Sequence, residues 1–205
     1  MIHSMNSDIY KSDYFYELPD ELVAKFPLEN RVQSKLLSVN DQDFHISQFP
    51  EIENKINKND LLILNETKVF QARLELMKQT GGRVEILIMD KINKYTANCL
   101  TKGINKKIIK QKLFSDRYPL DIKILPNESD NFLKIKFLQP IDQICSTIGS
   151  MPIPPYLKRS EQNIDKERYQ SVFANDKFNN SIAAPTASLH FDSTLLDRIK
   201  KNSYV

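Results

Sequence analysis

Glycine and cysteine are scarce in this chain of 205 residues, with four and two copies. No spacing of the glycines gives the GxGxxG turn of a dinucleotide fold or the GxxxxGK[ST] loop of a nucleoside triphosphate site. Cys99 and Cys145 lie far apart and have no CxxC or histidine spacing around them. The sequence therefore predicts no Rossmann or P-loop site, no disulfide framework and no zinc or other metal site.

Long apolar runs are also absent. The longest, Leu61–Leu64 and Ile86–Met89, are far shorter than the ~20 residues of a membrane span. Asp8, Asp13 and Glu17 interrupt the region where a signal peptide needs a continuous apolar stretch. We therefore expect a cytoplasmic protein with no membrane partner.

Neither sign of charge dominates, because 29 Lys and Arg face 26 Asp and Glu, for a net charge of +3. Whole-molecule attraction to nucleic acid is weak, so a polyanion has to bind a local patch. The clearest patch spans residues 102–112 and includes Lys106, Lys107 and Lys110. Such lysines can neutralise RNA phosphates. The alternative is a solvated lysine face that protects a sheet edge.

Period-two alternation dominates the middle of the chain and favours a small antiparallel barrel or sandwich. The alternating runs are 72–77, 83–89, 95–100, 120–125 and 132–138. Helical spacing predicts short helices at 19–26, 141–148, 165–174 and 193–201, and strands are expected at 35–39, 44–46 and, buried on both faces, 61–64. The fold class predicted is a discontinuous α/β domain, residues 1–68 and 149–205, with an inserted antiparallel β-barrel domain, residues 69–148.

Three further features stand out as candidate functional segments. The proline-rich residues 151–156 are stiff and suit a rigid crossing between domains or, less readily, a PxxP ligand. The loop 183–191 has small residues that admit a ligand, and its His190 is either a general acid or base or a histidine packed on Phe191. Arg73, one of only seven arginines, is either a fork for a carboxylate or phosphate or an inter-domain salt bridge.

Six segments, read together, carry a family resemblance. They are residues 13–19, 65–73, 80–87, 149–156, 165–170 and 183–191. In this order they resemble the S-adenosylmethionine:tRNA ribosyltransferase-isomerase family of the queuosine pathway. The resemblance implies an α/β domain with an inserted β-barrel, which agrees with the fold predicted from the pattern.

The activity implied by the resemblance is a ribosyl transfer. The ribosyl part of S-adenosylmethionine moves to 7-aminomethyl-7-deazaguanine at the tRNA wobble position and is rearranged to epoxyqueuosine, with release of adenine and methionine. S-adenosylmethionine is a co-substrate, with no metal and no resident cofactor. The partner is a tRNA with a GUN anticodon, and the protein is expected to be a monomer.

The resemblance places candidate site residues in the matching segments. Proton transfer is expected from His190 or Glu85. Substrate binding is expected from Arg73 (an anionic group), from Tyr156 or Tyr169 (the sulfonium or a base) and from Thr186. Outside these segments, tRNA binding is expected from Lys106, Lys107 and Lys110 of the lysine patch.

The chain also departs from the family pattern. Glu66, Lys68 and Gln71 replace the family's aspartate, arginine and proline, and Ser188 replaces a glycine. Family proteins continue beyond the last helix predicted here, so we expect a C-terminally truncated member that does not catalyse the reaction alone. The alternative is an inactive remnant, or half of a split enzyme, that retains only RNA-binding or structural capacity.

Overall fold

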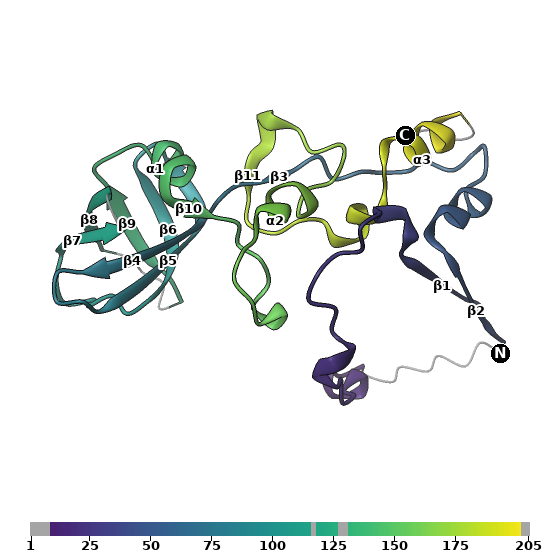
Figure 1. Cartoon of the computed structure of the whole chain (residues 1–205), viewed down its shortest axis with the longest axis horizontal. Helices are drawn as coiled ribbons and strands as arrows, with labels where there is room; N and C mark the ends of the chain where they lie inside the picture. The colour runs from purple at the N-terminus through teal and green to yellow at the C-terminus, as the bar shows by residue number, and fades with distance from the viewer. Residues whose placement is uncertain (1–8, 116–117, 127–130, 202–205) are drawn as a thin grey trace, which may run out of the picture.

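Six strands from the middle of the chain close into an antiparallel β-barrel in the computed structural model, which describes residues 9–115, 118–126 and 131–201. The strands are β4 (Arg73–Lys78), β5 (Arg83–Asn93), β6 (Thr96–Lys102), β7 (Lys110–Ser115), β8 (Tyr118–Leu125) and β9 (Leu133–Phe137). They pair in the order β4-β5-β6-β9-β8-β7, and β7 returns to β4 at Met77 and Lys78. Each strand therefore has a neighbour on both sides (Figure 1).

Alternate side chains of these strands fill the barrel. Leu74, Ile86, Leu120 and Phe137 are fully buried, as the two-residue period of a strand requires. Helix α1 (Ile141–Ile148) adds further buried side chains to the same core. Burial of one such side chain contributes about 1.5–3 kcal/mol, so this cluster is the main source of the barrel's stability.

The structure confirms the alternating runs as five of the six barrel strands, and it also confirms the helix predicted at 141–148. The pattern does not predict β7. Only Leu113 of this strand is buried, and lysines occupy two of its six positions. Its inward face therefore carries too few apolar residues to give an alternating signal.

Gly149 lies where the chain leaves the barrel. Strand β10 (Gly149–Ser150) pairs with the start of β4, opposite Leu74 and Arg73. A Cβ atom on Gly149 would lie 2.2 Å from the carbonyl oxygen of Gln71 and 2.4 Å from that of Cys145. Only glycine fits this close approach, which holds the proline-rich segment beside the first residue of β4.

Short elements make up the rest of the described chain. Strands β1 (Lys35–Val39) and β2 (Phe44–Gln48) form a hairpin, and β3 (Lys68–Val69) pairs in parallel with β11 (Asn179–Ser181). The α-helices are α2 (Asn163–Arg168) and α3 (Ser193–Lys200), and the 3-10 helices are Lys11–Tyr14, Asp20–Leu22, Arg31–Gln33, Phe49–Lys55, Pro155–Leu157, Asp176–Phe178 and Thr186–His190. Within the described residues, none of the helices is long and apolar enough to cross a membrane.

The predicted strands at 35–39 and 44–46 and the last helix are confirmed, but three other predictions outside the barrel are wrong. Leu61–Leu64 is not a strand buried on both faces, because Leu61 and Ile63 are 68% and 83% exposed. The segment 19–26 holds only the single turn Asp20–Leu22. The helix predicted at 165–174 runs over Asn163–Arg168, because Asp165 lies inside its first turn, where it accepts a hydrogen bond from the backbone of Gln162.

The segment before the barrel is tied to the segment after it. Arg31 donates from Nη1 to the carbonyl of Gln170 at 2.7 Å, and Arg168 donates to that of Leu28 at 2.7 Å. A second, smaller core joins Phe49 to the buried face of α3. Figure 1 shows these elements lying together, away from the barrel.

Candidate functional site

Arg73 and Glu85, two of the predicted site residues, lie on neighbouring barrel strands and form an ion pair, with Nη1 and Oε1 2.9 Å apart. Arg73 also donates from Nη2 to the carbonyl of Ile153 at 3.3 Å, and Lys102 Nζ lies 3.5 Å from the other oxygen of Glu85. Glu85 is therefore held between two cations. Arg73 joins the barrel to the proline-rich segment, so it serves both as a cationic fork and as a link across the two regions.

A cavity of about 380 Å³, called here the barrel cavity, opens beside this ion pair. Strands β5 and β6 supply half of its lining residues, and Pro155 lines it on the side of the proline-rich segment. The predicted residues Arg73, Glu85 and Lys106 all line it, together with the ring of Phe132. This combination of two cations, a carboxylate and an aromatic ring suits a polar ligand that also has a flat apolar face.

Tyr156, Tyr169 and Thr186 line a second cavity of about 240 Å³, called here the tyrosine cavity. They come from the 3-10 helix Pro155–Leu157, the end of α2 and the 3-10 helix Thr186–His190. Burial raises the pKa of the Tyr169 phenol, which therefore stays neutral near pH 7. The structure thus brings three predicted substrate-binding residues into one wall.

A third cavity of about 270 Å³, called here the arginine cavity, lies between the other two. It shares Arg73 and Pro155 with the barrel cavity, and Ile153 and Arg159 with the tyrosine cavity. Arg73 Nε and an oxygen of Glu161 are buried in its wall and have no hydrogen-bond partner among the residues that the structure describes. Buried polar atoms of this kind are costly unless something pairs with them.

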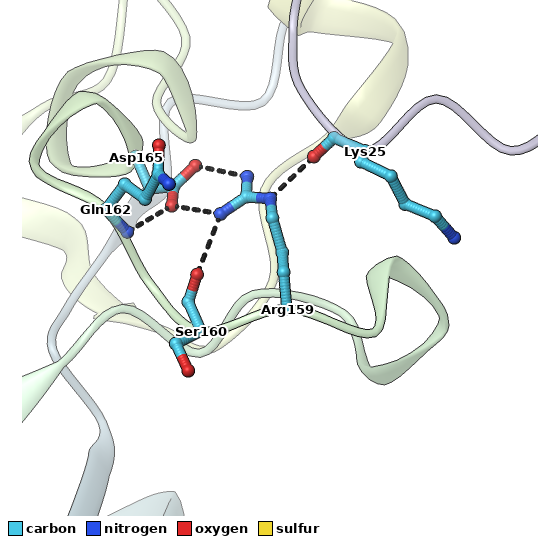
Figure 2. A network of polar contacts seen from close by, with 5 residues as sticks. All are labelled: Lys25, Arg159, Ser160, Gln162 and Asp165. Carbon is cyan, nitrogen blue, oxygen red and sulfur yellow. Dashed lines mark hydrogen bonds and ion pairs between the residues drawn. The ribbon is translucent and has the colours of Figure 1, made fainter.

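Arg159 is the residue of the site that the sequence analysis missed. Its guanidinium makes a two-pronged ion pair with Asp165, at 2.7 and 2.8 Å, and donates from Nε to the carbonyl of Lys25 at 2.5 Å (Figure 2). It also lies 4.7 Å from the ring of Phe26. The hydrogen bonds from Arg159 lower the pKa of Asp165, so the pair is fully charged at neutral pH. The feature of the sequence that could have pointed to Arg159 is the scarcity of arginine.

His190 lies apart from these cavities. Its Nδ1 is 2.9 Å from the hydroxyl of Ser34, and its ring centroid is 5.2 Å from that of Phe49. Burial lowers the pKa of His190, which favours the neutral imidazole. His190 does not line any of the three cavities, whereas its neighbour Leu189 lines the tyrosine cavity. The structure therefore does not bring His190 and Glu85 together.

The predicted tRNA-binding lysines lie in the turn before β7 and at the first residue of that strand. Lys106, Lys107 and Lys110 are all exposed, and Lys106 reaches the wall of the barrel cavity. The side chain of Gln111 donates to the carbonyls of Asn105 and Ile108 and fixes the turn that carries them. These lysines therefore stand on an ordered turn beside the cavity.

No group of three histidine, cysteine, aspartate or glutamate side chains that could hold a metal ion occurs in the parts of the chain that the structure describes. Cys99 and Cys145 are free and buried. Burial raises the pKa of both thiols, that of Cys145 to about 12. Neither thiol is therefore a nucleophile near neutral pH.

Lys68, which replaces an arginine of the family pattern, has a structural partner. Its Nζ lies 2.5 Å from a carboxylate oxygen of Asp176, in the 3-10 helix that precedes β11. Glu66, another departure, accepts a backbone hydrogen bond from Asn175 at 2.9 Å. Both departures sit where the segments before and after the barrel meet.

A family model described as "Queuosine biosynthesis protein" matches residues 11–204 of the chain. Among curated relatives, the S-adenosylmethionine:tRNA ribosyltransferase-isomerase of Acinetobacter baumannii strain ATCC 17978 is 42% identical over 92% of this chain and 54% of its own length. The protein of the same name from Legionella pneumophila strain Philadelphia 1 is 38% identical over 93% of this chain and 56% of its own length. The chain spans about half the length of the curated relatives it matches.

Among solved structures, the S-adenosylmethionine tRNA ribosyltransferase of Thermotoga maritima is 25% identical. The match covers 92% of this chain and 54% of that one, with a TM-score of 0.33.

Proposed function

Because this chain belongs to the queuosine biosynthesis protein family, we propose that it is a tRNA-modifying transferase-isomerase, or the part of one that carries the substrate cavities. The reaction proposed moves the ribosyl group of S-adenosylmethionine onto 7-aminomethyl-7-deazaguanine at the wobble position and releases adenine and methionine. The observation that carries the proposal is the row of three adjoining cavities, whose walls share Arg73 and Arg159 and contain every predicted substrate-binding residue.

Arg73 is the proposed anchor for the methionine carboxylate. Its Nη1 and Nη2 are paired with Glu85 and the carbonyl of Ile153, whereas its Nε, which is buried in the arginine cavity without a partner among the described residues, would donate to the carboxylate. Glu161, whose buried oxygen also has no partner there, would accept from the α-ammonium group of the same amino acid. One wall would thus pair with both charges of the methionine moiety.

Tyr156 and Tyr169 are proposed to face the sulfonium or to stack on a base. Both line the tyrosine cavity, and a neutral aromatic ring attracts a cation through its face. Thr186 lies in the same wall, where its hydroxyl can donate or accept a hydrogen bond to the ribose. Arg159 and Asp165 are positioning residues here, because their ion pair fixes the wall behind the tyrosines.

Glu85 and His190 remain the proposed proton-transfer groups. The reaction needs a base for a proton beside the sulfonium and an acid that assists adenine departure. Glu85 lines the barrel cavity directly. His190 is buried enough to favour its neutral form, which can act as a base, but it would have to act from beyond the tyrosine cavity.

The proposed partner is a tRNA with a GUN anticodon, held in part by Lys106, Lys107 and Lys110, and S-adenosylmethionine is the proposed co-substrate. We propose a monomer that works in the cytoplasm, where its tRNA substrate is found. The relatives that carry tRNA in their names support the choice of nucleic acid.

We also propose the domain division 1–68 and 149–205 for a discontinuous α/β domain, with 69–148 as the inserted barrel. The parallel pair β3–β11, the ion pair between Arg198 and Glu53 at 2.8 Å, and the hydrogen bonds of Arg31 and Arg168 support it. All of these join the first segment to the last.

Adenine release tests the proposed function. The chain is incubated with S-adenosylmethionine and a tRNA that carries the aminomethyl deazaguanine, alone and joined to the remaining part of the Acinetobacter baumannii relative. We expect turnover in the joined protein, which supplies the part of the relative that this chain does not match. Glu85→Gln and His190→Ala should each reduce that turnover by about 10²–10⁴-fold.

Arg198→Gln is the matched control, since it removes an ion pair whose two residues line none of the three cavities. Absence of adenine release from the joined protein would overturn the proposed function. Loss in the control equal to that in the two variants would overturn the proposed roles of Glu85 and His190.

A further inference from the structure

Three lysines stand in one row across the outside of the barrel. Lys110 on β7 is the direct partner of Lys123 on β8, and Lys123 is the direct partner of Lys136 on β9. Neighbouring strands lie about 4.7–4.9 Å apart, so three like charges follow one another at roughly that spacing. We call these three residues the lysine row.

The lysine row has no compensating partner among the described residues. All three side chains are exposed, and none of them takes part in an ion pair there. Like charges directly opposite one another on neighbouring strands are destabilising. Folding stability therefore does not account for the row, and its central member, Lys123, faces repulsion from both sides.

Protection of a sheet edge does not account for the lysine row either. Lysines blunt free edges in open sheets. Here β8 pairs with β7 on one side and β9 on the other, and β9 pairs with β6 beyond. Lys123 and Lys136 therefore lie in the interior of a closed sheet, where no edge needs protection.

The row continues the basic turn that borders the barrel cavity. Lys106 and Lys107 precede Lys110 by four and three residues, and Lys106 lines the barrel cavity. Beside the row, Lys112 lies opposite Asp121, so the next position along these strands is balanced in charge. The uncompensated charge is thus a narrow band that runs from the cavity across three strands.

We propose that the lysine row binds the sugar-phosphate backbone of an RNA helix, the stem of the tRNA whose wobble base is presented to the barrel cavity. A narrow band of closely spaced cations fits a line of phosphates, and such contacts orient a nucleic acid without reading its sequence. This inference rests on the proposed function for the identity of the RNA. It adds Lys123 and Lys136, which come from strands far along the chain from the lysine-rich turn.

RNA affinity as a function of salt tests this proposal. The probe is an anticodon stem-loop transcribed without modification, so that neither S-adenosylmethionine nor turnover enters the measurement. The triple variant Lys110→Gln, Lys123→Gln and Lys136→Gln should bind roughly tenfold or more weakly, and the slope of log affinity against log salt should fall by up to about three. The matched control changes Lys55, Lys58 and Lys177 to glutamine, which removes the same charge from exposed positions outside the barrel.

A second measurement separates binding from folding. Lys123→Gln alone should raise the melting temperature by roughly 1–3 °C, because it relieves repulsion from two neighbours, while it weakens RNA binding. The control variant with Lys55, Lys58 and Lys177 changed should neither raise the melting temperature nor weaken RNA binding in this way.

Several outcomes would overturn the proposal. The first is that the row and control variants have equal RNA affinities and equal salt slopes. The second is that the wild-type chain does not bind RNA. The third is that the chain binds vesicles of anionic lipid through the lysine row but does not bind RNA. Each leaves the proposed chemistry untouched, because adenine release by the joined protein is measured separately. Conversely, row-dependent RNA binding without any adenine release would retain the row and overturn the proposed function.

Discussion

The barrel and the segments on either side of it are stabilised in different ways. The barrel encloses one large cluster of buried side chains drawn from all six strands and α1. The flanking segments expose many apolar side chains, among them Phe15, Leu37 and Phe44, and rely on arginines that reach carbonyl groups and carboxylates across long sequence distances. Packing thus dominates in the barrel, and directional polar contacts dominate outside it.

This difference matters for the site, because its cavities lie where the two regions meet. Arg73 comes from the first barrel strand, whereas Arg159 and the tyrosines come from the segment that follows the barrel. The well-packed barrel can hold Arg73 and Glu85 rigidly. The polar contacts outside it are easier to rearrange when a ligand enters.

The largest effect is expected from Phe137→Ala in the barrel. Phe137 is fully buried, so its removal leaves a large cavity and should lower the free energy of unfolding by about 3–5 kcal/mol. Chemical denaturation followed by circular dichroism measures this change. Leu37→Ala, at an exposed position of β1, is the control and should change stability by no more than about 0.5 kcal/mol. Equal losses in the two variants would contradict the contrast between the regions.

Asp165→Asn should break the principal polar contact of the flanking segments. The side chains of Asp165 and Arg159 are only 5% and 12% exposed, so the variant leaves a buried guanidinium without its counter-charge and costs about 3 kcal/mol. Hydrogen exchange should accelerate in residues 156–170 and stay unchanged in β5 and β6. Faster exchange throughout the barrel would show that the regions are not stabilised independently.

The same ion pair predicts an acid dependence. The pKa of Asp165 is lower in the folded state than its ordinary value of 3.8, so the unfolded state takes up this proton at a higher pH. The contribution of Asp165 to stability is therefore present at pH 7 and is lost as the pH falls below about 4 through the folded pKa. Denaturation between pH 2 and 7 should show this loss in the wild type and not in Asp165→Asn.

Gly149→Ala tests whether the barrel stays folded when its contact with the segment that follows it is disturbed. The added Cβ would meet the carbonyl oxygens of Gln71 and Cys145, and the backbone has to shift at a cost of about 1–3 kcal/mol. We expect the barrel to remain folded while β10 separates from β4, because the barrel closes without β10. Amide exchange at Ser150 and Ile153 measures this. Gly82→Ala, where a Cβ meets only ordinary contacts, is the control.

The smallest effect is expected from His190→Gln. The variant removes the imidazole that is hydrogen-bonded to the hydroxyl of Ser34, so the free energy of unfolding should fall by about 1 kcal/mol. Because burial lowers the pKa of His190 below its ordinary value of 6.5, the unfolded state binds the proton first, and wild-type stability declines as the pH drops below about 6.5. A pH titration of the melting temperature that is identical in both proteins would contradict this.

The sequence predicted the parts of the fold that depend on pattern. Alternation located five barrel strands, and six short segments identified the family that the comparisons confirm. It missed β7, whose exposed lysines hide the strand period, and it placed a buried strand at Leu61–Leu64, where two of the side chains face solvent. A local pattern does not show which tertiary neighbours a short apolar run will meet.

The candidate site was predicted by residue but not by arrangement. The segments of the family pattern contain Arg73, Glu85, Tyr156, Tyr169 and Thr186, and the structure groups these into adjoining cavities. Arg159 was missed because its role depends on Asp165 and on the carbonyl of Lys25, a residue 134 positions earlier. Contacts of that kind have no signature in a single sequence.

The affinity for S-adenosylmethionine tests most directly the central claim that both regions form one ligand site. It is measured by titration calorimetry on the joined protein, with the barrel variant Arg73→Gln, the flank variant Tyr169→Ala and the control Arg198→Gln. We predict that the barrel and flank variants each weaken binding by roughly tenfold or more, the loss expected when a charged or aromatic anchor is removed, and that the control binds as the wild type does. Unchanged affinity in either the barrel or the flank variant would contradict the account.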